Sequence, residues 1–190
     1  DLTEVEKKAV EDAVLGAGAR EVLLTEQIIA GAIGARLPIE DPQGTMVVDL
    51  GGGRTEIAVL SLSGIVTFKS LQMAGDELNN DIVQFARHEF NVLLGESMAE
   101  QAKVKIGSAA ILEQSLDMRV RGRNLISGLP KEVVINDSQI RQALSRSVSF
   151  IIDNIKATLE VTPPELVADI YERGITLFGA GAQLKGLDEA

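Results

Sequence analysis

The chain has 190 residues, 45% of them hydrophobic and 24% charged, so it can build the core of one or two globular domains. Its net charge of −10 argues against a nucleic-acid-binding surface, because neutralising phosphates requires a basic patch, and the lack of cysteine excludes disulfides and thiolate metal sites. The chain opens in an acidic helix without a signal peptide and has no apolar run of membrane-spanning length, so we expect a piece of a longer cytoplasmic protein.

The N-terminal residues predict two helices around a short strand. Thr3 and Glu6 fit the capping-box pattern, and the apolar residues that follow repeat at helical spacing. The apolar triplet within residues 21–25 predicts a short strand, and the Ala- and Gly-rich residues 26–35 predict a second helix. Prolines and a glycine then mark residues 37–44 as a linker.

A run of three glycines is the central motif of the chain. Gly51, Gly52 and Gly53 join two predicted buried strands, residues 46–50 and 55–60, and a third strand over residues 65–71 completes an antiparallel meander. Consecutive unhindered N–H groups can line an anion-binding concavity, and Asp49 before them could hold a hydrated Mg²⁺ over a phosphate. A plain hairpin turn explains the glycines equally well. The absence of a following Gly-Lys-Ser/Thr or helix pattern excludes a P-loop and a dinucleotide fingerprint.

The middle of the chain predicts two helices followed by a hairpin. The helices cover about residues 75–90 and 96–106. In the second, Glu100 and Lys103 form an i,i+3 pair that is typical of an ordinary surface ion pair. Alternating residues predict strands over 114–121 and 131–136, joined by the loop 125–130, with Arg119, Arg121 and Arg123 on the solvated face. The single histidine, His88, is predicted to lie on a helix surface, because no second His or Cys could share a metal with it.

The C-terminal part predicts a long helix, a short helix and a buried strand. Asn136 caps the long helix over about residues 139–160, and the short helix covers residues 165–170. The strand over residues 175–178 enters Gly179-Ala180-Gly181, and a short helix starts from Ala182. Small residues between a strand and a helix can bind an anion or a ribose, although a tight strand-to-helix turn explains them at least as well.

The order of these motifs is more specific than any one of them. The informative segments are Thr3-Glu-Val-Glu, Gly16-Ala-Gly-Ala-Arg, Ala32-Ile-Gly-Ala, Met46-Val-Val-Asp-Leu-Gly-Gly-Gly, Ala74-Gly-Asp-Glu, residues 122–130, Thr162-Pro-Pro-Glu-Leu-Val-Ala-Asp-Ile and Glu172-Arg-Gly-Ile. In this order they resemble the C-terminal half of the MreB family of bacterial actin homologues, over essentially all 190 residues.

The resemblance implies an α/β, actin-like ATPase fold of the ribonuclease H-like class. Residues 37–74 and 140–190 would form the large C-terminal subdomain, residues 75–139 a small inserted α+β subdomain, and residues 1–36 a remnant of the N-terminal lobe. It further implies ATP or ADP with Mg²⁺ as cofactors and head-to-tail filaments of the protein itself. These filaments would guide cell-wall synthesis at the inner face of the membrane in rod-shaped bacteria, together with membrane-anchor and cell-wall-synthesis proteins.

The resemblance also assigns the nucleotide site residue by residue. Asp49, acting on Mg²⁺ through water, and the glycine turn would form the second phosphate loop. The segment Glu100, Gln101, Ala102 and Lys103 would hold the ribose and adenine through its Glu and Lys. The adenosine loop would be Gly179, Ala180, Gly181 and Ala182.

Four residues depart from the family pattern. Arg54 stands where a Thr usually helps to hold the attacking water, and Gln27 replaces the Glu that positions this water. Glutamine can hydrogen-bond a water but cannot accept its proton at neutral pH. Lys105 replaces a common acid, and Ala180 a common glycine. We therefore expect nucleotide binding with slow hydrolysis, so that the chain is at most part of a slow ATPase.

Three alternatives remain open from the sequence. A sugar kinase or exopolyphosphatase shares the superfold, but no catalytic acid for a second substrate stands out. A chaperone of the DnaK type would need a peptide-binding domain, which this chain lacks. An adaptor that uses the fold without nucleotide turnover is favoured by Arg54, Gln27 and Ala180.

Overall fold

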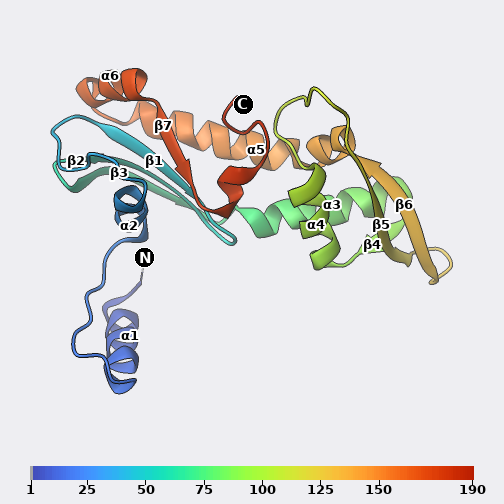
Figure 1. The fold of residues 1–190 in the computed structure, drawn as a ribbon, viewed down its shortest axis with the longest axis horizontal. Helices are drawn as coiled ribbons and strands as arrows, with labels where there is room; N and C mark the ends of the chain where they lie inside the picture. Colours follow the sequence, from blue (N-terminus) through green and yellow to red (C-terminus); the bar gives the residue numbers. More distant parts are fainter. Residues whose placement is uncertain (1) are drawn as a thin grey trace.

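A four-stranded sheet with helices on both faces forms one part of the molecule in the computed structural model, which describes residues 2–190 (Figure 1). Its strands are β1 (Thr45–Leu50), β2 (Thr55–Ser61), β3 (Gly64–Leu71) and β7 (Ile175–Phe178), in the order β3-β2-β1-β7. The first three are antiparallel neighbours, which confirms the predicted meander, and β7 runs parallel to β1.

The alternation of side chains along β1 sends successive residues to two different cores. Met46, Val48 and Leu50 pack in a core with Ile151 of α5 (Asp137–Glu160) and with a residue of α6 (Pro164–Arg173). Val47, on the opposite face, packs with buried residues of α2 (Gln27–Gly34). Asp49 follows Val47 by two residues, so its carboxylate also faces α2.

A smaller unit lies at the other end of α5. It contains α3 (Gly75–Phe90), α4 (Glu96–Ile106) and an antiparallel sheet of β4 (Val92–Leu94), β5 (Asp117–Asn124) and β6 (Pro130–Asn136). The N-terminal half of α5 packs into the core of this unit, while its later residue Ile151 packs under the four-stranded sheet. One helix therefore belongs to both cores, and the division of the chain into subdomains stays a prediction.

Helix α1 (Glu4–Gly16) stands apart from the rest of the molecule (Figure 1). Its N-terminus has the predicted capping box, in which the Thr3 hydroxyl accepts from Glu6 N and the Glu6 carboxylate accepts from Thr3 N at 2.8 Å. None of its residues is buried, and Val5 is 80% exposed. None of the described helices is long and apolar enough to cross a bilayer.

Several sequence-based predictions of secondary structure were wrong. Residues 21–25 form no strand, because this segment pairs with no other described strand, and Leu23 is 84% exposed. Strand β7 is an edge strand with partly exposed residues rather than a buried one, because it pairs on one side only. Strand β4 was not predicted, and β5 begins three residues later than expected. The last turn is a 3-10 helix, η1 (Ala180–Gln183), rather than a helix from Ala182.

Candidate functional site

The glycine turn presents bare backbone at the end of β1. Gly51 N donates to Arg54 O at 3.0 Å, which closes the turn. The carbonyls of Gly51 and Gly52 accept from Gly75 N at 3.1 Å and Asp76 N at 2.8 Å, which fastens the turn to the start of α3. Within the described part of the chain, the N–H groups of Gly52 and Gly53 donate to no other group. Two free donors on residues without side chains fit the oxygens of a phosphate. The Asp76 carboxylate is the side chain that lies nearest to both glycines.

A hollow of about 620 Å³ lies over this turn. Its lining consists of Gln27, Gly51, Gly52, Gly53, Arg54, Gln72, Ala74, Asp76 and Glu77. The side chain of Arg54 is half exposed, and its Nη1 lies 3.9 Å from Oε1 of Glu56. The charged side chains that line the hollow are thus one cation, Arg54, and two carboxylates, Asp76 and Glu77. Phosphates placed here would need a divalent cation to offset the acidic charges.

Asp49 is buried between α2 and the loop that follows β7. Its Oδ2 accepts a hydrogen bond of 2.6 Å from Gln27 Nε2. On the other side, Gly179 approaches so closely that a Cβ there would lie 2.5 Å from Asp49 Oδ1. The neighbouring carboxyl of Glu56 has a raised pKa, chiefly because of burial, with the charge of Asp49 adding to the effect and Arg54 opposing it.

The described residues contain no group of three or more His, Asp or Glu side chains that could hold a metal ion directly. A magnesium ion near Asp49 would therefore be coordinated by waters and phosphate oxygens, as Mg²⁺ often is, with Asp49 accepting hydrogen bonds from those waters. Asp49 itself lines neither hollow, so its link to such an ion would run through water.

A second hollow, of about 380 Å³, adjoins the first and shares Gly51, Gly52 and Asp76 with it. Its other lining residues are Gly75, Leu78, Glu100, Lys103, Val104, Ala180, Gly181, Gln183 and Leu184. Lys103 Nζ donates to Glu100 Oε2 at 2.8 Å and to Gly75 O at 2.9 Å, and this lysine hydrogen bond is the main cause of the lowered pKa of Glu100. A lining that combines this polar pair with aliphatic side chains is what a flat heterocycle with a polar sugar requires.

The walls of the second hollow are tied together behind it. Ala109 N donates to Lys185 O at 2.7 Å, and Lys185 Nζ donates to Lys105 O at 2.6 Å. These bonds join the segment after α4 to the segment after η1. These hydrogen bonds therefore fix the positions of α4 and η1, which line the hollow, relative to each other.

Five of the predicted site residues line neither of these hollows, and Asp49 is one of them. Ala102 is fully buried in the core of the smaller unit, and the amide of Gln101 lies near Ser97 on the outer side of α4. Gly179 lies against Asp49, and Ala182 lines a different hollow. For Gln101 and Ala102 the reason is helical geometry, since residues one and two positions after Glu100 point away from its face.

The apolar walls of the second hollow were not predicted from the sequence. Val104 is 66% exposed and lies four residues after Glu100, so it shares the cavity-facing side of α4. An exposed valine on the face that carries a polar pair was a signal that could have identified it. Leu184 follows η1 and had no comparable signal.

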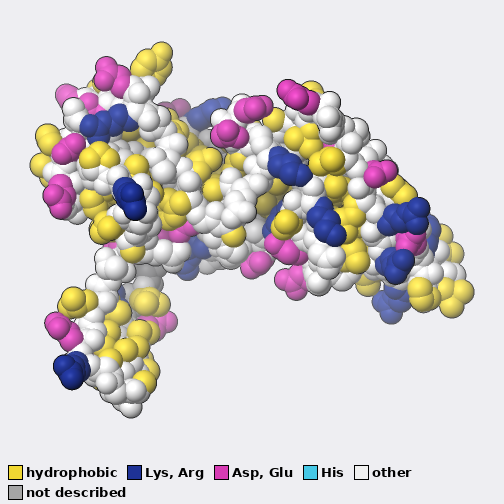
Figure 2. Space-filling view, in the orientation of Figure 1, with side chains coloured by type: hydrophobic (Ala, Val, Ile, Leu, Met, Phe, Trp, Pro, Cys, Tyr) yellow, Lys and Arg dark blue, Asp and Glu magenta, His cyan; other side chains and the backbone are white. Residues whose placement is uncertain are grey.

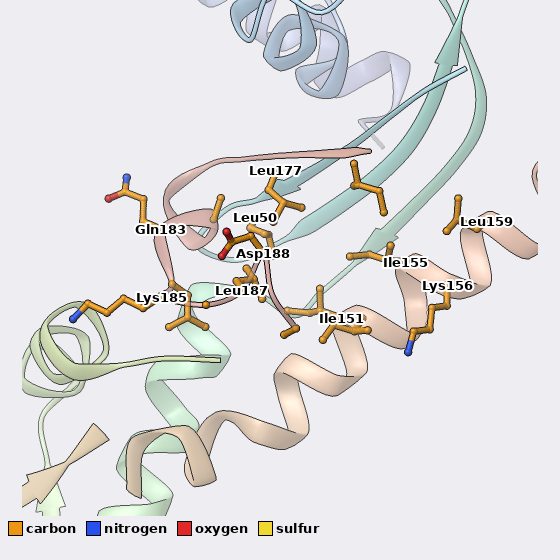
Figure 3. A pocket seen from close by; sticks show the side chains of 16 residues that line it. Leu50, Ile151, Ile155, Lys156, Leu159, Leu177, Gln183, Lys185, Leu187 and Asp188 are labelled. Carbon is orange, nitrogen blue, oxygen red and sulfur yellow. The ribbon is translucent and has the colours of Figure 1, made fainter. Parts of the chain in front are cut away.

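A third hollow, of about 800 Å³, lies between α5 and β7 (Figure 3). Aliphatic side chains dominate it, including Leu50, Ile151, Ile155 and Leu177, while the ammonium of Lys185 points away. Its surface lacks the convergent donors that a phosphate or sugar needs. It is therefore a poorer nucleotide site than the two smaller hollows.

Comparisons with known proteins agree on one family. The family model described as MreB/Mbl protein matches residues 1–190. The chain is 44% identical to the cell shape-determining protein MreB of Escherichia coli over 98% of the chain and 54% of the relative. It is 42% identical to the cell shape-determining protein Mbl of Bacillus subtilis over 100% of the chain and 57% of the relative. The chain thus spans about half the length of the curated relatives it matches.

Solved structures show the same fold. MreB 5 of Spiroplasma citri bound to AMPPNP superposes with a TM-score of 0.95 at 38% identity, over 99% of this chain and 56% of that one. The same protein bound to ADP gives a TM-score of 0.96. The MamK double helical filament shares the fold alone, at 18% identity and a TM-score of 0.77 over 98% of this chain and 55% of that one.

Proposed function

Because the chain belongs to the MreB/Mbl family, we propose that it is the C-terminal half of an ATP-binding, filament-forming actin-like protein that maintains rod cell shape by guiding cell-wall synthesis. The observation that carries the proposal is the pair of adjoining hollows that share Gly51 and Gly52. One hollow offers free N–H donors to phosphates, and the other offers a polar pair and aliphatic walls to a nucleoside. The relative from Spiroplasma citri was crystallised with AMPPNP and with ADP.

The residues take distinct roles toward the nucleotide in this proposal. The N–H groups of Gly52 and Gly53 bind the phosphates, and Glu100 and Lys103 bind the ribose and adenine, with Val104 against the base. Asp49 holds Mg²⁺ through water, and this ion, when bound, supplies the positive charge that the acidic hollow lacks.

Hydrolysis is slow in this proposal. Gln27 stands where the family has a carboxylate, and its amide N–H group donates to Asp49. An amide cannot take a proton from water at neutral pH. Arg54 is also unable to accept a proton, but its planar guanidinium can pair with a phosphate.

Self-association is supported by the charges at the two ends of the molecule. Arg119, Arg121 and Arg123 are exposed on the β5–β6 hairpin, where Figure 2 shows dark blue side chains gathered. The opposite end, at α6, carries Glu165 and Glu172, which are also exposed. A basic surface at one end and an acidic one at the other favour head-to-tail stacking, which produces open filaments. A filament of the same fold exists in MamK.

The remaining parts of the proposal concern the full-length protein. We propose that its filaments lie at the inner face of the membrane and act with membrane-anchor and cell-wall-synthesis proteins. The cell shape-determining relatives support this role.

The proposal is tested by nucleotide binding to the full-length protein by isothermal titration calorimetry. Lys103→Ala should weaken Mg·ATP binding at least tenfold, because it removes a donor from the nucleoside hollow and frees Glu100 to turn away. Lys105→Ala on the same helix is the matched control, since Lys105 is exposed and does not line the hollow, and it should stay within twofold of wild type. Equal affinities for the two variants would exclude this hollow as the site.

An adaptor without nucleotide turnover is the second candidate. It is favoured by the hydrogen bond between Gln27 and Asp49, which closes this corner without a metal. Lack of Mg·ATP binding by the wild-type full-length protein, with pelleting retained, would support the adaptor.

A further inference from the structure

The hydrogen bond between Gln27 and Asp49 joins two elements that are distant in sequence. Gln27 is the first residue of α2, and Asp49 lies near the end of β1 on the face that α2 covers. The bond measures 2.6 Å between Nε2 and Oδ2, and the residue Asp49 is 4% exposed. The start of α2 is therefore fixed to the end of β1 by one amide donor.

A second contact fixes the same helix to β7. A Cβ built on Gly31 would run into the ring of Phe178, so the backbone of α2 lies directly against this ring. Ile28 and Ala32 on either side of Gly31 are buried in the same core. Helix α2 is thus held at the ends of both β1 and β7, the two strands that lead into the glycine turn and the η1 loop.

Acidic side chains surround the hydrogen bond between Gln27 and Asp49. Glu26 precedes it, and Glu56 lies opposite Asp49 in the β1–β2 ladder. Arg54 is directed to Glu56 at 3.9 Å. A neutral amide can donate to Asp49 in this acidic corner. The carboxylate expected from the family resemblance has no donor when ionised, and it would place a second negative charge against Asp49.

We propose that Gln27 is a positioning residue that holds α2 on the ends of β1 and β7 without a bound cation. A glutamate at this place would need a cation or a protonated bridge between the two carboxylates. Docking of α2 in this protein is therefore independent of Mg·nucleotide. This docking of α2 depends only on contacts at the ends of β1 and β7, whether or not the neighbouring hollows bind ATP.

Hydrogen–deuterium exchange of the full-length protein tests the proposal. In the wild type, the exchange rate of residues 27–34 should differ by less than twofold between EDTA, Mg²⁺ and Mg·ADP. In Gln27→Glu, exchange of this helix in EDTA should be at least tenfold faster, and Mg²⁺ should slow it again. In Gln27→Ala, exchange should be faster in all three conditions, because the donor is lost and no ion replaces it.

A double variant separates the hydrogen bond from other effects of the substitution. Gln27→Glu with Asp49→Asn exchanges donor and acceptor across the same pair, so protection in EDTA should return to within about threefold of wild type. Glu26→Gln is the matched control, because Glu26 makes no side-chain cap bond to α2, and it should leave exchange unchanged.

Two results would overturn the inference. One is a tenfold slowing of wild-type α2 exchange on addition of Mg·ADP. The other is unchanged protection of Gln27→Glu in EDTA. Since the EDTA arms contain no nucleotide, a failure of ATP binding would leave both results interpretable.

Discussion

At the scale of single residues, one neutral side chain sits among acids. Gln27 donates to a buried aspartate while Glu56, whose pKa burial raises, lies in the adjacent strand. Such a side chain can hold a geometry but cannot perform the proton transfer that a carboxylate would. The same residue thus explains both the closed corner and the expectation of slow turnover.

We predict that Gln27→Glu combined with Arg54→Thr raises ATP hydrolysis by the full-length protein at least tenfold. A general base typically contributes 10²–10⁴-fold, about 3–5 kcal/mol of barrier. Each single change should do less, because a base and a hydroxyl that act on one water are not additive. Phosphate release in Mg²⁺ measures the rates, and filament lifetime should shorten in parallel. A wild type that already hydrolyses as fast as the double variant would show that neither residue limits the reaction.

At the scale of elements, side chains at the start of α5 tie it to the chain before β5. Asp137 accepts from Leu116 N at 2.9 Å and from the Ser115 hydroxyl at 3.0 Å. The Leu116 N–H bond is the largest cause of the lowered pKa of Asp137, and the nearby Arg141 guanidinium adds to it. The Asn136 and Gln139 side chains complete the capping box of this helix.

This lowered pKa leads to a pH-dependent prediction. A carboxyl with a lower pKa in the folded state stabilises fully above its unfolded pKa of about 3.9, and this contribution is lost as pH falls through the folded pKa. Asp137→Asn should therefore be less stable than wild type at pH 7, and the difference should shrink below about pH 4. Urea unfolding between pH 7 and pH 3 measures it.

Asp117→Asn is the control for this experiment. Asp117 is an exposed carboxyl in β5 that accepts no side-chain hydrogen bond from any described residue. Its stability difference from wild type should be small at every pH. A difference for Asp137→Asn that does not change with pH would mean that its charge does not contribute.

The elements that the sequence predicted well are those with local signals. The capping box at Thr3, the helix cap at Asn136 and the glycine turn after β1 involve residues within a few positions of one another. Residues 21–25 have a strand-like composition but no partner strand, and β4 has only three residues, too few to show alternation. The Glu100–Lys103 pair was evident from spacing. The contact of Gln27 with Asp49 was not, because it spans 22 positions and depends on α2 covering one face of the sheet.

At the scale of the whole molecule, basic side chains gather at the β5–β6 hairpin (Figure 2). Two exposed arginines of the β5–β6 hairpin share one acidic partner, because Arg121 and Arg119 lie 2.6 and 3.8 Å from Glu132. Exposed pairs of this kind contribute little to folding. Their charge is therefore free to act on a neighbouring molecule.

Reversing the charge of Arg121 and Arg123 should reduce pelleting of the full-length protein with ATP at least fivefold at low salt. The melting temperature of the monomer should stay nearly unchanged, because both side chains are solvated. Sedimentation across a range of salt concentrations measures the effect, which should diminish as screening increases. Normal pelleting of this variant would remove the hairpin from the contact.

The 190-residue chain by itself should bind Mg·ATP only weakly. It spans about half of its relatives, and the resemblance places the first phosphate loop in the other half. Isothermal titration should give a Kd no tighter than about 10–100 μM, or about −6 kcal/mol. Submicromolar binding would show that the two hollows described above suffice.

The continuity of α5 has a mechanical consequence. This helix has 24 residues and so is about 36 Å long, and it is embedded in one core at each end. Val148 and Ile151, near its middle, line a small crevice with Gly51, Gly75 and Gly181, next to the proposed phosphate site. A rigid helix that is packed in a core at each end and lines a crevice near its centre can act as a lever. We expect a tilt of a few degrees at this pivot to move the hairpin at the far end by ångströms. A change at the proposed phosphate site would then alter the orientation of the hairpin that we propose as a filament contact.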